Sequence, residues 1–202
     1  EEMSAFPNIT DVGLTGGNPR YDLDTLREDF QINTPPEKTI LLTFGGLSLA
    51  RIPYENLQSF PDFTFITFDK NAPNLPNLIS VQTQKAQVHS SIDYTHIRPV
   101  DLMPLCGRVV SKPGFSTYSE AMRLNIPIVT LSREGFAEAQ ILLEGLQNYS
   151  SHQILTSGEF FESNWEFIHQ PLNPPRLSEV LDKTGSETIA KMLVNGVKNA
   201  LR

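Results

Sequence analysis

The sequence predicts an α/β fold: a Rossmann-like, doubly wound, mainly parallel sheet flanked by helices. Short runs such as 39–44, 108–111 and 127–131 are apolar on both faces, as the buried strands of a parallel sheet are. Segments with apolar residues at helical spacing separate these runs along the chain. Strands that alternate with helices favour a parallel sheet covered by helices on both faces.

The elements follow one another from an irregular lead-in over residues 1–20, which contains several Pro and Gly. Asp22 is a suitable N-cap for a short helix that reaches Phe30. The predicted strands are 39–44, 63–68, 78–81, 108–111, 127–131 and 153–155. The predicted helical segments after Phe30 are 53–59, 101–106, 117–124, 136–146, 159–168 and 186–201.

The helix 117–124 has a marked start. Pro113 and Gly114 form a turn after the strand 108–111. Thr117 and Glu120 then have the spacing of a capping box, which predicts Thr117 as N-cap and Glu120 reaching back to it. Asn125 and Pro127 end the helix.

We divide the chain into three parts. Residues 1–35 are an interdomain linker with a short helix, and 36–170 form the Rossmann-like domain. Residues 171–202 are a proline connector and an amphipathic helix with Ile189, Leu193, Val197 and Leu201 on one stripe, which we expect to pack on the same domain. Trp165 lies among phenylalanines and is expected in the core.

Composition excludes several classes of protein. A formal charge of −7 over 202 residues argues against a nucleic-acid partner, and no apolar run reaches the roughly 18 residues of a membrane span. A single cysteine, Cys106, excludes an internal disulfide and favours a cytoplasmic protein. The four histidines are scattered, so no metal site is expected. The chain starts at Glu1, which suggests a piece of a longer protein.

The loop after the strand 108–111 is the candidate ligand site. Ligands of open α/β sheets bind at the carboxyl ends of strands, and a helix that starts there offers unpaired N–H groups to an anion. Ser111, Lys112, Gly114, Ser116 and Thr117 lie on this loop or in the first turn of the helix after it.

The residues around this loop resemble the donor-binding, C-terminal half of GT-B glycosyltransferases, of the MurG-like and plant UDP-glycosyltransferase kind. Lys112-Pro-Gly-Phe-Ser-Thr-Tyr-Ser-Glu120, followed by Ile126-Pro127, matches their motif in spacing. The resemblance is closest to the GT-like domain of plant arabinokinases and its bacterial relatives, where Thr43-Phe-Gly-Gly46, Phe136-Ala-Glu138 and Ser163-Asn-Trp165 also recur. It covers roughly residues 12–202.

The resemblance implies a nucleotide-sugar donor, UDP-linked or of another nucleotide, as substrate and no other cofactor. It assigns Glu120 to the ribose hydroxyls, and Ser116 and Thr117 to the diphosphate. For all three residues, helix capping explains the sequence as well. Gly45 and Gly46 would let the backbone approach the phosphate or the acceptor, although a tight strand–helix connection explains them too.

The same resemblance assigns Glu138 and Gln140 to the hydroxyls of the donor sugar, and Lys112 to the diphosphate. The first two residues can also be simple polar residues in a helix's first turn, and Lys112 can be a solvated lysine at a strand end. Lys112 occupies the position where retaining GT-B enzymes of the E-x7-E type have a glutamate, so the inverting branch is favoured.

The resulting expectation is the donor-binding domain of an inverting glycosyltransferase, whose catalytic base lies in an N-terminal GT-B domain that this sequence lacks. On its own this domain is expected to bind its donor without turnover. Two alternatives stay open: a non-catalytic sensing or scaffolding module of GT-B shape, and one half of a sugar-nucleotide epimerase.

Overall fold

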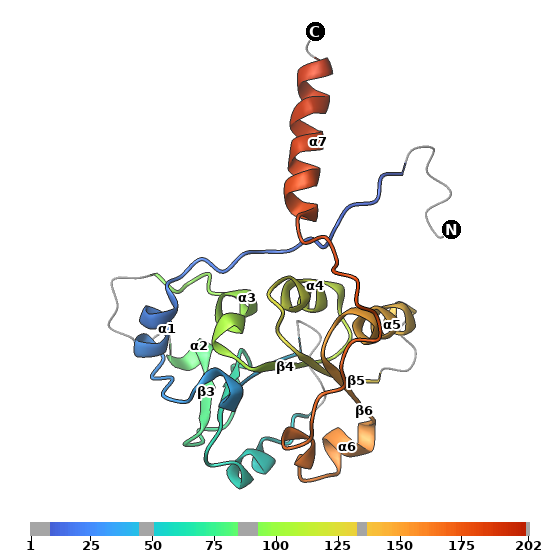
Figure 1. Ribbon diagram of the computed structural model, residues 1–202. Coiled ribbons are helices and arrows are strands. Elements are labelled where there is room, and N and C mark those ends of the chain that lie inside the picture. The colour runs from blue at the N-terminus through green and yellow to red at the C-terminus, as the bar shows by residue number, and fades with distance from the viewer. Residues whose placement is uncertain (1–8, 45–50, 85–92, 133–136, 201–202) are drawn as a thin grey trace.

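The computed structural model describes residues 9–44, 51–84, 93–132 and 137–200, and its centre is a parallel sheet (Figure 1). Within these ranges the sheet has six strands in the order β3-β2-β1-β4-β5-β6, and every neighbouring pair is parallel. The strands are β1 (Thr39–Thr43), β2 (Thr64–Thr67), β3 (Leu78–Ser80), β4 (Arg108–Ser111), β5 (Ile128–Leu131) and β6 (His152–Leu155). The predicted Rossmann-like class and each predicted strand are confirmed, with ends that differ by at most one residue.

Helices connect the strands. They are α1 (Leu23–Asp29), α2 (Val81–Gln84), α3 (Pro99–Leu102), α4 (Phe115–Arg123), α5 (Ala139–Tyr149), α6 (Ser157–Phe161) and α7 (Gly185–Ala200). Short 3₁₀ turns occupy Pro36–Lys38, Tyr54–Ser59, Met103–Leu105 and Glu166–Ile168. Asp22 caps α1 as predicted, because its Oδ1 accepts a hydrogen bond of 2.9 Å from the Thr25 N–H.

Alternation along the strands builds one apolar core on each face of the sheet. On one face, strand residues such as Leu41 and Val109 pack against α1, α3, α4 and α5. On the other, residues such as Leu42 and Val110 pack against the turn 54–59 and the segment 160–168. Figure 1 shows α4 and α5 on one side of the sheet and α6 on the other. The sheet is therefore doubly wound.

The capping box predicted for α4 is wrong. The helix begins at Phe115, two residues before the predicted cap, because the chain turns directly after Gly114. Gly114 has extended φ and ψ angles of −168° and 128° and occupies the N-cap position itself. Thr117 therefore lies in the first turn, and Glu120 bonds to a distant segment instead.

The helix predicted over 159–168 is split in two. α6 starts with a true capping box, in which Thr156 and Glu159 bond to each other's backbone N–H. It ends at Phe161, and Trp165 has a left-handed φ of 65°, which no α-helix accommodates. The turn Glu166–Ile168 follows. Trp165 is fully buried, so the prediction that it belongs to the core is confirmed.

The C-terminal helix α7 forms where it was predicted, but its environment differs from the prediction. It stands away from the sheet and its flanking helices (Figure 1), and Ile189, Leu193 and Val197 are 39%, 66% and 60% exposed. The described residues therefore leave its apolar stripe uncovered, whereas the sequence predicts that this stripe packs on the domain. Among the helices of the described ranges, none combines the length and hydropathy needed to cross a membrane.

Candidate functional site

The strand order locates the candidate site. From β1 the chain moves outward to β2 and β3, and from β4 it moves the other way to β5 and β6. The loops after β1 and β4 therefore diverge, and in open α/β sheets such a switch point is where ligands bind. Thr43 at the end of β1 is in register with Ser111 at the end of β4. The two loops predicted to bind the donor thus leave neighbouring strands, although Gly45 and Gly46 lie outside the described residues.

The start of α4 lies at this switch point. Gly114 has no side chain, and no side chain of the described residues caps the helix. The first intrahelical bond runs from the Tyr118 N–H to the Gly114 carbonyl, 3.1 Å. The N–H groups of the turn before it therefore have no intrahelical acceptor, which is the arrangement that binds anions. Ser116 is exposed and Thr117 half-buried in this turn, and Phe115 is 54% exposed.

Hydroxyl groups line the sheet below this helix start. Thr43, Ser111 and Thr130 are in register on three adjacent strands, so their side chains lie on the same face of the sheet. The Tyr118 hydroxyl donates to Thr130 Oγ1 at 2.6 Å, and burial raises the pKa of Tyr118, which keeps that donor protonated. Ser111 Oγ is buried and has no hydrogen-bond partner among the described residues. The site therefore has a polar floor.

Glu138 and Gln140 lie at the start of α5, and both are exposed. Because β5 is next to β4, the starts of α4 and α5 lie at the same edge of the sheet. Lys112 follows β4 directly and is half-buried. The predicted residues 111–117, 138 and 140 are thus gathered at one edge.

Glu120 is half-buried in the second turn of α4. Its Oε1 accepts a hydrogen bond of 3.1 Å from the N–H of Gly17, a residue of the lead-in. Within the described ranges its Oε2 accepts no hydrogen bond. A carboxylate has about four acceptor positions, so this contact leaves room for further donors.

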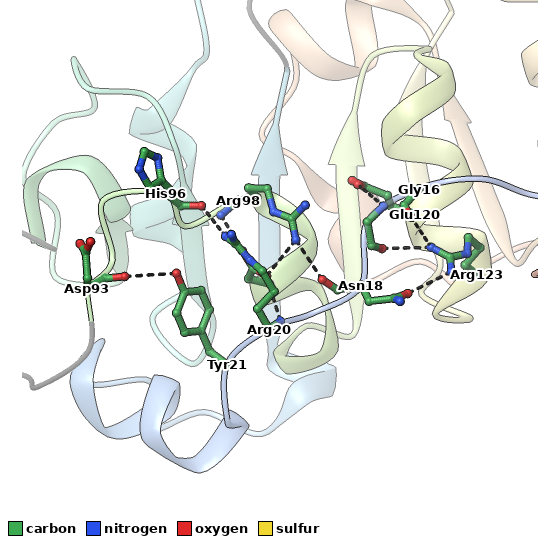
Figure 2. Close-up of polar contacts among 11 residues, drawn as sticks. Gly16, Asn18, Arg20, Tyr21, Asp93, His96, Arg98, Glu120 and Arg123 are labelled. Atoms are coloured by element: carbon green, nitrogen blue, oxygen red, sulfur yellow. Dashed lines mark hydrogen bonds and ion pairs between the residues drawn. The ribbon is translucent and has the colours of Figure 1, made fainter. Parts of the chain in front are cut away.

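The partner of Glu120 belongs to residues 14–20, which we call the strap. Figure 2 shows this segment held by Glu120 and Arg123 of α4 and by Arg98, which precedes α3. The guanidinium of Arg123 donates to the carbonyls of Gly16 and Gly17 at 2.8 and 3.1 Å, and to Asn18 Oδ1 at 2.9 Å. Ser119 Oγ donates to the Thr15 carbonyl. The segment predicted as an irregular linker is therefore fixed to the domain.

The other end of the strap is held by a buried carboxylate. Asp101 Oδ1 accepts from the Arg20 N–H at 3.1 Å, and its Oδ2 accepts from Arg20 Nη2 and from the Arg98 N–H, both at 2.8 Å. Arg98 also donates to the Asn18 carbonyl at 2.9 Å. The bonds that Arg20 and Asn18 make to Asp101 and Arg98 join residues 80 or 81 positions apart in the chain, which no local pattern predicts.

The strap also contacts the base of α7. The Leu14 N–H donates to the Asp182 carbonyl at 2.7 Å, and Arg123 Nε to the Lys183 carbonyl at 3.1 Å. A Cβ on Gly185 would lie 1.9 Å from the Gly13 carbonyl oxygen, so only glycine fits there. One continuous segment therefore links Glu120 to the start of α7.

Metal chemistry has no support in the part of the chain that the structure describes. There, no three His, Cys, Asp or Glu side chains are grouped in a way that could hold an ion. The candidate site is therefore a set of amides, hydroxyls and carboxylates at the edge of a sheet, which suits a ligand with phosphate and hydroxyl groups.

Comparison with known proteins gives the fold a context. No protein-family model and no curated protein matches the chain. Among solved structures, the glycosyltransferase SnogD from Streptomyces nogalater is similar with a TM-score of 0.50 and 14% identity, over 94% of this chain and 50% of that one. The glycotransferase of kitacinnamycin is similar over 59% of this chain and 30% of that one, with a TM-score of 0.40 and 13% identity.

The chain thus spans half or less of the length of these two structures. At such low identity the likeness concerns the fold and not the reaction. The order of the six described strands and the likeness to SnogD both indicate the same class of fold. The chain has a Rossmann-like fold of the kind found in GT-B glycosyltransferases.

Proposed function

We propose that this chain is the donor-binding half of a cytoplasmic GT-B glycosyltransferase of the MurG-like and arabinokinase-like kind, and that it binds a nucleotide sugar at the β1–β4 switch point. The observation that carries the proposal is the uncapped start of α4 beside the carboxyl ends of β1 and β4. A diphosphate placed there would accept hydrogen bonds from the free first-turn N–H groups. The positive end of the helix dipole would stabilise its negative charge.

The remaining residues take roles that fit their positions. Ser116 and Thr117 would donate hydroxyls to the diphosphate, with Lys112 supplying a positive charge. Glu120 would accept the ribose hydroxyls through Oε2 while Gly17 holds Oε1. Glu138 and Gln140, exposed at the start of α5, would bind the hydroxyls of the sugar.

The reaction of the full enzyme would be a direct displacement with inversion, because a lysine occupies position 112. This half would orient the donor and stabilise the charge that develops on the departing diphosphate. The catalytic base would come from an N-terminal GT-B domain. This chain alone is expected to bind a nucleotide without transferring its sugar.

A second candidate is a GT-B-shaped module that binds no donor. The bond between Gly17 and Glu120 favours it, since the strap already uses part of the carboxylate that ribose would need. Titration with a nucleotide separates the two candidates, because only the first predicts saturable binding.

Replacing Ser116 with aspartate tests the phosphate site. We expect calorimetry to show saturable binding of UDP to the parent chain and about tenfold weaker binding to Ser116→Asp, because the new carboxylate repels the diphosphate at the helix start. An acidic residue in the first turn of a helix is favourable, so the fold should be kept.

The matched control is Ser157→Asp, which places the same carboxylate on an exposed serine in the first turn of α6. It should bind UDP like the parent chain. Equal losses in both variants, or no saturable binding of UDP to the parent at millimolar concentration, would contradict the proposed site.

Replacing Glu120 with glutamine tests the ribose contact separately. The amide oxygen can still accept from the Gly17 N–H, so the strap should stay in place. Loss of a charged acceptor should weaken UDP binding about tenfold, which is about 1.4 kcal/mol. The same substitution should leave binding of 2′,3′-dideoxy-UDP unchanged, because that nucleotide has no hydroxyl to donate. Equal weakening for both nucleotides would remove Glu120 from the ribose site.

A further inference from the structure

The peptide unit that joins Gly16 to Gly17 lies between two charged side chains of α4. Its carbonyl oxygen accepts a hydrogen bond of 2.8 Å from Arg123 Nη1, and its N–H donates to Glu120 Oε1 at 3.1 Å (Figure 2). The described residues contain no cis peptide bond, and a trans peptide is planar with its C=O and N–H pointing in opposite directions. The bond from Arg123 therefore fixes the direction in which the Gly17 N–H points.

We propose that Arg123 is a positioning residue for the ribose contact of Glu120. This inference rests on the proposed function, in which Glu120 accepts the ribose hydroxyls. Arg123 does not touch the nucleotide in this arrangement. It holds one peptide of the strap, and that peptide holds Oε1 of Glu120, so that Oε2 is kept in one orientation for the ligand.

The hydrogen bonds and the burial of Arg123 suit this role. Its side chain is only 8% exposed. It donates to the carbonyls of Gly17 and Lys183, both at 3.1 Å, in addition to the Gly16 carbonyl. Its Nη2 donates to Asn18 Oδ1 at 2.9 Å. A guanidinium carries its five N–H donors in a rigid, planar fork, so acceptors on several sides leave it little freedom to turn.

The two glycines of the strap let its backbone reach the Glu120 side chain. Gly16 has a φ of +153°, and a Cβ there would lie 2.9 Å from Glu120 Cγ. A Cβ on Gly17 would lie 3.2 Å from Glu120 Oε1. A side chain at either position would therefore push against Glu120. The strap thus contacts the methylene groups and one oxygen of this residue and leaves the second oxygen for a ligand.

The chemistry of the contact favours positioning over blocking. A backbone N–H is a neutral donor, so it orients the Glu120 carboxylate and leaves its negative charge in place. Arg123 lies one turn further along α4, where it could pair with Glu120 directly. It bonds to the carbonyls of the strap instead. The charged acceptor that ribose hydroxyls prefer is therefore preserved.

Calorimetry of the 202-residue chain with UDP and with 2′,3′-dideoxy-UDP tests the inference. Arg123→Ala should weaken UDP binding about fivefold, which is a typical cost of ordering one long side chain on binding. It should leave the affinity for 2′,3′-dideoxy-UDP unchanged, because that nucleotide has no hydroxyl to donate to Glu120. Equal weakening for both nucleotides would overturn the inference, since it would mean that Arg123 acts on the diphosphate.

A double-mutant cycle tests whether Arg123 acts through Glu120. In a Glu120→Gln background, Arg123→Ala should weaken UDP binding no further, because the carboxylate that it positions is already gone. Losses that add in the double variant would show that Arg123 contributes independently and would overturn the positioning role.

Arg27→Ala is the matched control for the lost charge. Arg27 is also an arginine that donates to a backbone carbonyl, that of Thr34 at 2.6 Å, but it lies on α1. This variant should bind UDP like the parent chain. Gly16→Ala serves as a second variant if Arg123→Ala does not fold. It keeps the guanidinium and displaces Glu120 through its Cγ, so it should also weaken the binding of UDP and not of 2′,3′-dideoxy-UDP.

Failure of this inference can be told from failure of the proposed function. If the parent chain shows no saturable binding of UDP, both are wrong. If Glu120→Gln weakens UDP binding while Arg123→Ala and Gly16→Ala bind UDP like the parent chain, the donor site stands and only the positioning role of Arg123 is wrong.

Discussion

Replacing Asp101 with alanine is expected to lower the free energy of unfolding by about 3 kcal/mol, since removing one partner of a buried ion pair typically costs 3–5 kcal/mol. The Asp101 side chain is fully buried, and it accepts hydrogen bonds from Arg20 and from the backbone N–H of Arg98. Both arginine side chains are 41% exposed and can be hydrated after the substitution, so we expect a loss at the lower end of this range. Urea denaturation followed by circular dichroism measures it.

The contribution of Asp101 should depend on pH in a predictable direction. Burial alone would raise the pKa of this carboxyl, but hydrogen bonds from Arg20 and Arg98 outweigh it and leave the pKa below its ordinary value. A lowered pKa stabilises the folded state above the unfolded-state value of about 3.9 and loses that effect as pH falls through the folded-state value. The difference in stability between the parent and Asp101→Asn should therefore be constant from pH 5 to 8 and shrink below pH 4.

Asp22→Ala is the matched control. Asp22 is also an aspartate that accepts a hydrogen bond from a backbone N–H, but it caps a helix in solvent. Its replacement should lower the free energy of unfolding by only about 1 kcal/mol. If Asp101→Ala costs no more than this control, or if the difference for Asp101→Asn grows as the pH falls below 4, the strap is not held by the ionised carboxylate.

Much of the fold could be predicted from the sequence, because its strands are marked locally. Residues 39–44 and 127–131 are apolar on both faces, and such runs fit the centre of a parallel sheet and few other structures. The N-cap of α1 at Asp22 was equally local, since the side chain bonds to a residue three positions away. The edge of the sheet that gathers residues 111–117, 138 and 140 followed from these elements.

The strap could not be predicted, because its contacts are not local. Arg123 and Gly16 are 107 positions apart, and Asp101 and Arg20 are 81 positions apart. The wrong prediction for Glu120 is an example of such a non-local contact. Its spacing from Thr117 fits a capping box, but the glycine before α4 starts the helix earlier and the carboxylate bonds to Gly17 instead. The glycines at 16 and 17 indicated an irregular lead-in, whereas the Gly17 N–H bonds to Glu120 and a Cβ on Gly16 would lie 2.9 Å from the Glu120 Cγ.

In the segment 157–168 the start of the helix is marked by a local pattern that the sequence analysis did not use, and its end is not marked locally. Thr156 and Glu159 form the kind of capping box that was expected at α4, and the start of α6 obeys it. The sequence predicts a continuous helix over 159–168, but Trp165 has a left-handed φ of 65° and interrupts it. Bulky residues rarely adopt this conformation, so the packing of the indole must compensate its cost.

Replacing Trp165 with alanine should therefore have the largest effect of any substitution considered, a loss of about 4 kcal/mol. The indole is fully buried, its ring centroid is 5.0 Å from that of Phe160 and 5.5 Å from that of Phe167, and its Nε1 donates to the Phe160 carbonyl at 2.7 Å. Alanine would leave a cavity and an unpaired buried carbonyl. For a domain of this size the melting temperature should fall by roughly 10 °C.

Phe161→Ala is the control for this prediction, because the Phe161 ring contacts the same Phe160 ring edge-to-face, with centroids 4.9 Å apart, but is 37% exposed. This substitution should lower the free energy of unfolding by about 1 kcal/mol. The larger loss in Trp165→Ala reflects the cavity that removing a buried side chain leaves. Trp165→Phe should fall between them, since it keeps most of the ring volume but loses the donor to Phe160. Equal melting temperatures for Trp165→Ala and Phe161→Ala would mean that the core on this face of the sheet is not closed around the indole.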